Sequence, residues 1–152
     1  KTALTCIEHT RYGISWLAVG VMRACIEAST KYVLERHQFG KPLAGFQMVQ
    51  ERIAEMVVAY EASRMLSTQV ACLKDKGENV TRETAIAKFH NLEQVMKATR
   101  TSLELHGAYG FTDDFPVERF YRDMVGPLIF GGTAHVQKLV IGRLTLGVDA
   151  IR

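Results

Sequence analysis

The sequence is short of cysteine and proline and has no long hydrophobic run. Its three cysteines are an odd number without a CxxC pair, and Cys25 and Cys72 fall in apolar, helix-like stretches, which predicts buried thiols in a reducing compartment. The three prolines fall at expected breaks between helical stretches, where an all-α protein tolerates them. No apolar run reaches the ~18 residues of a transmembrane helix, so we expect no membrane span.

Clustered basic charge and metal-ligand spacing are also missing. Nineteen lysines and arginines against sixteen acidic residues give a net charge of +3, but they form no basic run of the kind that binds nucleic acid. The five histidines show no pairing at metal-ligand spacing, so we expect no metal. The chain begins at Lys1 without a targeting segment. We interpret it as one domain cut from a longer cytoplasmic protein, or a mitochondrial matrix protein in a eukaryote.

What the sequence does have is helical periodicity. Apolar residues recur at three- and four-residue steps from position 5 or 10 to 36, from 46 to 76 and from 81 to 107. Thr81 is the expected N-cap of the third stretch. A shorter helix is expected to open with Pro116 at its first position, and another with Thr133 as its cap. No stretch alternates with period two, so we predict an all-α, up-and-down bundle of three long and two shorter helices.

The loop between the two longest helices, residues 36–40, offers groups that suit a nucleotide. Arginine binds phosphate in a bidentate manner, and a phenylalanine ring can stack on a base. Arg36 and Phe39 supply these groups three residues apart. The alternative is a solvated helix end at which Arg36 interacts favourably with the helix dipole.

Two glycine-containing segments could also serve a ligand. Gly131, Gly132 and Thr133 directly precede a helix, whose free N–H groups attract phosphate. An ordinary threonine cap with a flexible lead-in explains the same residues. Residues 105–111 form a glycine turn at a chain reversal, which a tight connection between helices would explain equally well.

These segments occur together in one family. "ERHQFGKPLAGFQ" at 35–47, "LHGAYGFTDDFPVERFYRD" at 105–123 and "IFGGTAHVQKLVIGR" at 129–143 resemble the C-terminal helical domain of the acyl-CoA dehydrogenases. "HTRYGISW" at 9–16 is most similar to the glutaryl-CoA dehydrogenase branch and to relatives that act on carrier-protein thioesters. The resemblance covers nearly all of residues 1–152 and implies that an N-terminal helical domain and a middle β-domain are absent here. It also implies FAD as cofactor and self-association into a dimer or tetramer.

The resemblance implies which residues contact FAD. Those positions are Arg36, Gln38, Phe39, Gln47, Glu104, Gly107, Ala108, Thr133 and His135. Arg36 would contact the pyrophosphate of a neighbouring subunit's FAD, and Phe39 would lie near its adenine. Thr133 and His135 would touch the adenosine end of the FAD bound by their own subunit. Glu104 departs from a glutamine that is common in the family, and a carboxylate near phosphates is unfavourable unless it is paired or protonated.

The implied reaction is α,β-dehydrogenation of an acyl thioester of CoA or a carrier protein, which needs a base for the α-proton. The two positions that carry this base in the family are Gly131 and Thr10, next to Arg11, and neither is a carboxylate. Glu8 is the nearby candidate, unless it is only a solvent-facing charge. A glutamate at position 131 would be expected to restore the reaction. The isolated domain is expected to be inactive, and the alternatives are a catalytically silent subunit or a flavoprotein with other chemistry, such as oxygenation.

Overall fold

The computed structural model describes residues 2–150 and consists almost entirely of helices. The helices are α1 (Thr2–Glu35), α2 (Gln47–Asp75), α3 (Thr81–His106), α4 (Val117–Ile129) and α5 (Ala134–Leu146). Short 3₁₀ turns lie at η1 (Leu43–Gly45) and η2 (Gly107–Phe111). Three long helices followed by two shorter ones confirm the predicted bundle.

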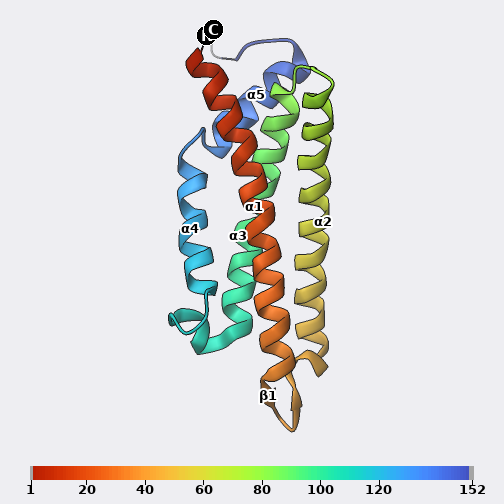
Figure 1. The fold of residues 1–152 in the computed structure, drawn as a ribbon, viewed down its shortest axis with the longest axis vertical. Helices are drawn as coiled ribbons and strands as arrows, with labels where there is room; N and C mark the ends of the chain where they lie inside the picture. The colour runs from red at the N-terminus through yellow and green to blue at the C-terminus, as the bar shows by residue number, and fades with distance from the viewer. Residues whose placement is uncertain (1, 151–152) are drawn as a thin grey trace.

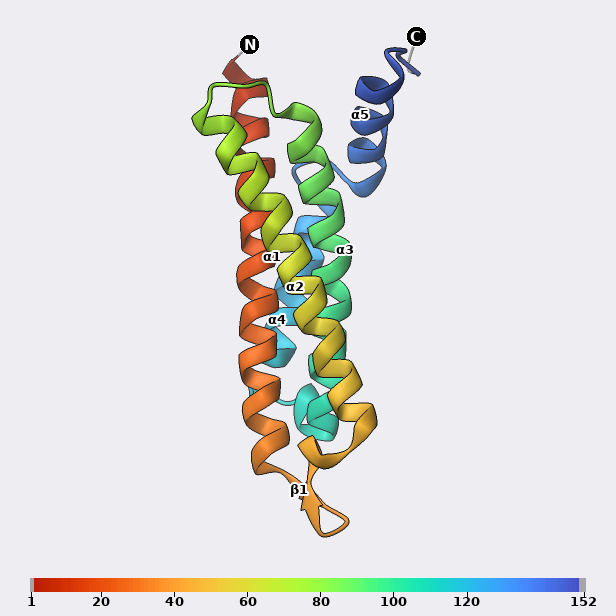
Figure 2. The same cartoon turned by 90° about the vertical axis from the view of Figure 1, so that its right-hand side faces the viewer.

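The three long helices stand side by side, and α4 packs along α1 and α3 (Figure 1). The start of α1 and the end of α5 lie at one end of the bundle, and the α1–α2 connection lies at the other (Figure 2). Helix α5 leans away from the body of the bundle and packs against α3 (Figure 2). The loops between helices are therefore sorted to the two ends, and this sorting positions the candidate site.

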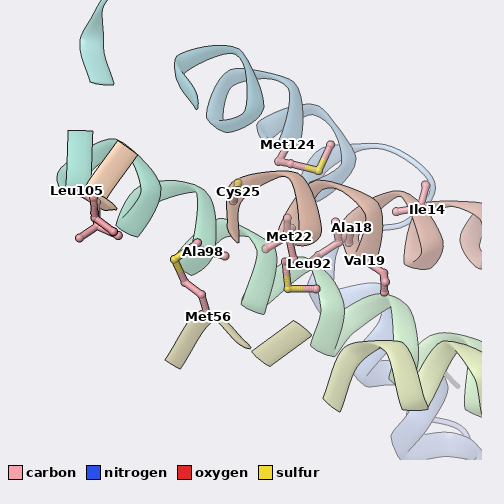
Figure 3. Close-up of a cluster of buried hydrophobic side chains, with 12 residues drawn as sticks. Ile14, Ala18, Val19, Met22, Cys25, Met56, Leu92, Ala98, Leu105 and Met124 are labelled. Carbon is pink, nitrogen blue, oxygen red and sulfur yellow. The ribbon is translucent and has the colours of Figure 1, made fainter. Parts of the chain in front are cut away.

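The core lies where α1 and α3 face each other, with α2 and α4 closing its sides. Met22 and Cys25 of α1 are fully buried, with Leu92 of α3, Met56 of α2 and Met124 of α4 around them (Figure 3). These residues recur at helical spacing along their helices, so each helix buries one face. Burial of aliphatic and thioether side chains is the main favourable term that holds such a bundle together.

Several local predictions need correction. Thr81 is the first residue of α3 and not its cap, because the side chain of Asn79 accepts the Thr81 N–H at 3.0 Å. Pro116 is the residue before α4, one position earlier than predicted. Pro127 lies inside α4 and not at a break. It removes one intrahelical hydrogen bond, and its position in the last turn limits the disruption to the end of the helix.

Two further expectations changed in part. Cys25 is buried as predicted, and burial raises the pKa of its thiol to about 12, but Cys72 is exposed on α2. The loop predicted at 36–40 contains a two-residue antiparallel pairing, β1 (His37–Gln38) with β2 (Lys41–Pro42).

No single described helix is long and apolar enough to cross a membrane. Only α4 and α5 taken together pass such a test, and they are bent by 49°.

Candidate functional site

The β1–β2 hairpin presents an aromatic ring to solvent at one end of the bundle. Phe39 is 92% exposed, and its φ of 53° is in the left-handed region that non-glycine residues rarely adopt. Its ring meets Phe46 edge-on at 6.3 Å, and the Lys41 ammonium lies 4.2 Å from the centre of the Phe46 ring. The hairpin therefore holds Phe39 at its tip instead of burying it in the core.

Arg36 enters this hairpin and is also exposed. Its backbone oxygen accepts the N–H of Leu43 at 2.8 Å, which closes the base of the hairpin. Gln38 is exposed on the same connection, and Gln47 is exposed at the start of α2. The structure thus places four of the residues expected to contact the cofactor at one end of the bundle, with their side chains accessible.

The η2 turn lies at the same end of the bundle (Figure 1). Gly107 ends α3 with a φ of 60°, and both Gly107 and Ala108 are exposed. Gly110 is buried, and a Cβ there would collide with the backbone oxygen of Leu103, so the turn requires glycine. The segment read as either a ligand turn or a tight connection is a tight connection that also exposes the two predicted residues.

Glu104 lies on α3 just before this turn and is paired with two arginines. Its carboxylate accepts hydrogen bonds from Arg52 of α2 at 2.8 Å and from Arg100 of α3 at 2.9 Å. The hydrogen bond from Arg100, supported by Arg52, lowers the pKa of Glu104. Pairing with two arginines therefore offsets the unfavourable effect of a carboxylate near phosphates. The three side chains together keep one positive charge.

The Gly131–Gly132 segment lies far from the hairpin, between α4 and α5 (Figure 1). The Phe130 oxygen accepts from the Lys88 ammonium at 3.0 Å, and the Gly132 oxygen accepts from it at 2.6 Å. The Gly131 oxygen accepts from Arg11 Nε at 3.1 Å. Two cationic side chains from α3 and α1 therefore bind three successive carbonyl groups.

Lys88 is a functional candidate that the sequence analysis missed. It is fully buried on α3, and burial, with a smaller effect of Arg11, lowers the pKa of its ammonium to about 8. The available signal was its position four residues before Leu92 and three after Ala85, on the buried face of the helix. A lone lysine in such a stripe must reach polar partners when buried.

The backbone conformation of Gly131 and its close neighbours both disfavour a side chain at this position. Its φ is 68°, and a Cβ on it would lie 2.9 Å from Ile14 Cδ1 and 3.3 Å from Lys88 Nζ. The side-chain direction at 131 thus faces α1 and α3. The expectation that a glutamate at position 131 restores the reaction stays a prediction, and this loop conformation counts against it because both the backbone and the neighbours disfavour a side chain there.

The other residues predicted near the base divide between two places. Thr10 lies within 4.0 Å of the position of that Cβ, but its hydroxyl donates to the Cys6 oxygen at 2.9 Å. Glu8 is exposed and accepts the Thr81 hydroxyl at 2.7 Å, which ties it to the start of α3. Its role as a base stays a prediction.

Thr133 stands at the N-cap position of α5, as predicted, but its side chain makes no capping hydrogen bond. His135 is exposed in the first turn of the same helix. The Thr133 side chain is therefore not engaged in capping α5, and the His135 side chain is accessible. Among residues 2–150, no cluster of three or more histidine, cysteine or acidic side chains could hold a metal ion.

Comparisons with known proteins agree with this arrangement. Residues 1–146 match the family model described as acyl-CoA dehydrogenase, C-terminal domain. A glutaryl-CoA dehydrogenase of Desulfococcus multivorans is 41% identical over 143 residues, 93% of this chain and 37% of that protein. An acryloyl-CoA reductase (NADH) of Anaerotignum propionicum is 39% identical over 143 residues, 94% of this chain and 36% of that protein.

A solved structure extends the match to three dimensions. A glutaryl-CoA dehydrogenase from Mycobacterium smegmatis in complex with FADH2 matches with a TM-score of 0.94 and 28% identity, covering 98% of this chain and 39% of that one. The chain spans just over a third of the length of the curated relatives it matches. By sequence and by structure, the chain belongs to the acyl-CoA dehydrogenase family and corresponds to its C-terminal helical domain.

Proposed function

We propose that this chain is the C-terminal domain of a longer FAD-dependent enzyme that oxidises the α,β-carbon bond of an acyl thioester, with CoA or a carrier protein as the thiol. The observation that carries the proposal is a set of exposed groups at the hairpin end of the bundle, where the hairpin residues Arg36 and Phe39 and the Arg52–Glu104–Arg100 cluster of α2 and α3 all lie. It joins cationic groups to an exposed aromatic ring, as an anionic dinucleotide requires.

The residues present fit FAD. Phe39 is exposed in a left-handed backbone conformation, although burial would stabilise a phenylalanine side chain that binds no ligand. Pairing of Glu104 with two arginines leaves excess positive charge where the resemblance puts the pyrophosphate. Arg36, Gln38, Phe39, Gln47, Gly107 and Ala108 would hold the cofactor of a neighbouring subunit. Thr133 and His135 would hold the adenosine end of their own.

FAD, when bound, would accept the β-hydrogen of the thioester as a hydride. This chain would orient the cofactor, close one wall of the acyl pocket and take part in the removal of the α-proton. Glu8 is the carboxylate that we assign to that proton, with Arg11 beside the loop. For this role the Glu8 carboxylate would have to exchange its hydrogen bond with the Thr81 hydroxyl for one with the substrate.

A second function is favoured by one observation. Gly131 carries no proton acceptor and adopts a conformation that disfavours a larger residue. A subunit that binds FAD and completes an assembly without turning over an acyl thioester fits this observation.

Self-association is part of the proposal. A groove of about 600 Å³ runs between α2 and α3, lined by Ala54, Met56, Ala59, Ala62 and Ala98, with charged residues at its edges. Val58 at this groove is 69% exposed, and Met65, about two turns further along the same face of α2, is 62% exposed. Exposed apolar surface of this kind usually marks an interface, and a second copy of the chain is the occupant that the resemblance implies.

The experiment is substrate-dependent bleaching of the flavin under anaerobic conditions, in the full-length protein that contains this domain. The proposal expects bleaching by a short-chain or dicarboxylic acyl-CoA. Glu8→Gln should slow it by about 10²–10⁴-fold, the scale of general-base catalysis. Arg36→Ala should weaken FAD retention by about 1.5–3 kcal/mol, because a charge-assisted hydrogen bond is lost.

The results of these measurements distinguish a dehydrogenase from a silent subunit and test the role of Glu8. Bound FAD that no acyl thioester bleaches would support the silent subunit and contradict the dehydrogenase. Fast bleaching that survives Glu8→Gln would contradict the assignment of Glu8 and leave the dehydrogenase standing.

A further inference from the structure

Burying a lysine in a helical bundle costs free energy unless polar partners compensate its ammonium group. Methionine or leucine at position 88 would fill the same space without removing an ammonium group from water. Lys88 is fully buried on α3, and among the described residues no carboxylate pairs with it. Its hydrogen-bonding partners are the carbonyl oxygens of Phe130 and Gly132, at 3.0 and 2.6 Å. Its location thus connects the core of α3 to the loop that precedes α5.

The loop is held from several sides. Arg11 binds the Gly131 oxygen, and Gln137 adds a second donor to the Gly132 oxygen at 3.0 Å. Gly131 and Gly132 have φ values of 68° and 93°, so the two residues depend on these contacts to hold a conformation that a free chain would share among many others. Three side chains from three helices define this one conformation.

The carbonyl contacts fix where the N–H groups point. No peptide bond among the described residues is cis, so each N–H points opposite to the carbonyl of the preceding residue. The carbonyls of 130, 131 and 132 point at Lys88 and Arg11. The N–H groups of Gly131, Gly132 and Thr133 therefore point away from the core, and no acceptor among the described residues takes a hydrogen bond from them. A cation on a carbonyl also strengthens the N–H of the same peptide as a donor.

We propose that Lys88 is a positioning residue, whose ammonium holds the Phe130–Thr133 loop so that its N–H groups and the Thr133 side chain face the ligand of the proposed function. The role rests on that function only for the identity of the ligand. The tether and its effect on the loop are properties of this chain alone.

The proposal has a signature that a packing role lacks. The charge that bears on Lys88 comes from Arg11 of α1, which stays protonated at all relevant pH values. Helix α4 contributes the Phe130 carbonyl, α5 contributes the uncharged Gln137, and His135 of α5 is exposed. Loss of the Lys88 proton should therefore weaken the hydrogen bonds to the loop near the pH at which this ammonium titrates, about 8.

The first test follows the carbonyl ¹³C resonances of the three backbone amides that join residues 130 to 133, from pH 6.5 to 10 by carbon-detected NMR of the chain, in a His135→Asn background that removes the nearby imidazole. The three amides should share one titration, with the midpoint of the Lys88 side chain. Lys88→Arg should keep the low-pH positions throughout, because a guanidinium does not titrate in this range. Amides that do not move while the Lys88 side chain titrates would overturn the proposal, and this outcome needs no variant to fold.

The second test measures FAD dissociation from the full-length protein. Lys88→Met should raise the dissociation constant at least tenfold, whereas Lys31→Met, an exposed lysine on α1, should change it less than twofold. Equal affinities for wild type and Lys88→Met would overturn the positioning role. A loop that titrates with Lys88 in a protein that no acyl thioester bleaches would instead contradict the proposed dehydrogenase and leave the tether in place.

Discussion

Glu104 of α3 accepts a hydrogen bond from Arg52 of α2 at 2.8 Å, and this contact links the two helices beside the hairpin. Arg100, four residues before Glu104, donates to its other oxygen at 2.9 Å. The carboxylate thus neutralises part of a cationic cluster at the place where the family resemblance puts a pyrophosphate. Its contribution to stability is small, because water and salt screen exposed ion pairs.

Glu104→Gln should increase the affinity for FAD. The amide still accepts a hydrogen bond but no longer cancels the charge of Arg52 and Arg100, so the potential at the pyrophosphate becomes more positive. We expect up to about tenfold slower FAD release at low salt, and a smaller effect at high salt because screening acts on exposed charges. Stopped-flow release of FAD from the full-length protein measures it. Glu93→Gln, an exposed acid on the same helix, is the control and should have no effect.

Val58→Glu should reduce self-association with little effect on folding. Val58 is 69% exposed beside the groove between α2 and α3, so a buried carboxylate would arise only in the assembly. Sedimentation velocity over a hundredfold concentration range should show larger species for the wild type and a monomer for the variant. Leu146→Glu, equally apolar and exposed but at the end of α5, should associate like the wild type. A wild type that stays monomeric throughout would contradict the proposed interface.

The three long helices were predictable from the sequence because their apolar residues repeat at helical spacing over two dozen or more positions. Details at the helix ends were less predictable. Pro127 lies inside the last turn of α4, where its missing N–H removes one intrahelical hydrogen bond, and no local signal distinguishes this position from a break. Cys72 has apolar neighbours in sequence, but its side chain faces solvent because the face of α2 that packs on the core lies elsewhere.

The exposed half of the candidate site was also predictable, since Arg36, Phe39 and Thr133 belong to contiguous motifs. The buried half was not. Lys88 lies 42 residues before Phe130 in sequence, and their contact depends on how α3 packs against the loop after α4. The pairing of Glu104 with Arg52 likewise joins residues 52 positions apart. Such contacts follow from packing, which periodicity alone does not specify.

Stability should rise with pH in the alkaline range through Lys88. Burial lowers the pKa of this ammonium from 10.5 to about 8 in the folded chain. Between these values the unfolded chain binds more protons than the folded one, so the free energy of unfolding increases with pH and the gain is complete above 10.5. Urea unfolding at pH 7.5, 9 and 10.5 should show that the free energy of unfolding of the wild type, relative to that of Lys88→Met, rises with pH by about 3 kcal/mol at most. A constant difference would mean that Lys88 has the same pKa in the folded and the unfolded chain, as a well solvated ammonium would.

Gly131→Glu tests whether the missing base can be restored, and the structure suggests that one substitution is not enough. A residue other than glycine at a φ of 68° costs about 1–2 kcal/mol, and its Cβ would press on Ile14 Cδ1 at 2.9 Å. Gly131→Ala should show both penalties as a lower melting temperature. Gly131→Glu should recover part of the loss, because its carboxylate can pair with Lys88, whose Nζ lies 3.3 Å from the Cβ position.

Ile14→Val removes the interfering Cδ1 and should relieve the steric part in the double variant Ile14→Val/Gly131→Glu. If the loop then turns the carboxylate towards the acyl pocket, anaerobic flavin bleaching in the full-length protein should rise by about 10²–10⁴-fold over wild type. If the carboxylate instead stays paired with Lys88, the double variant should be more stable than Ile14→Val/Gly131→Ala and bleach no faster than wild type. That result would mean that the loop conformation, and not only the absent side chain, keeps this position from serving as the base.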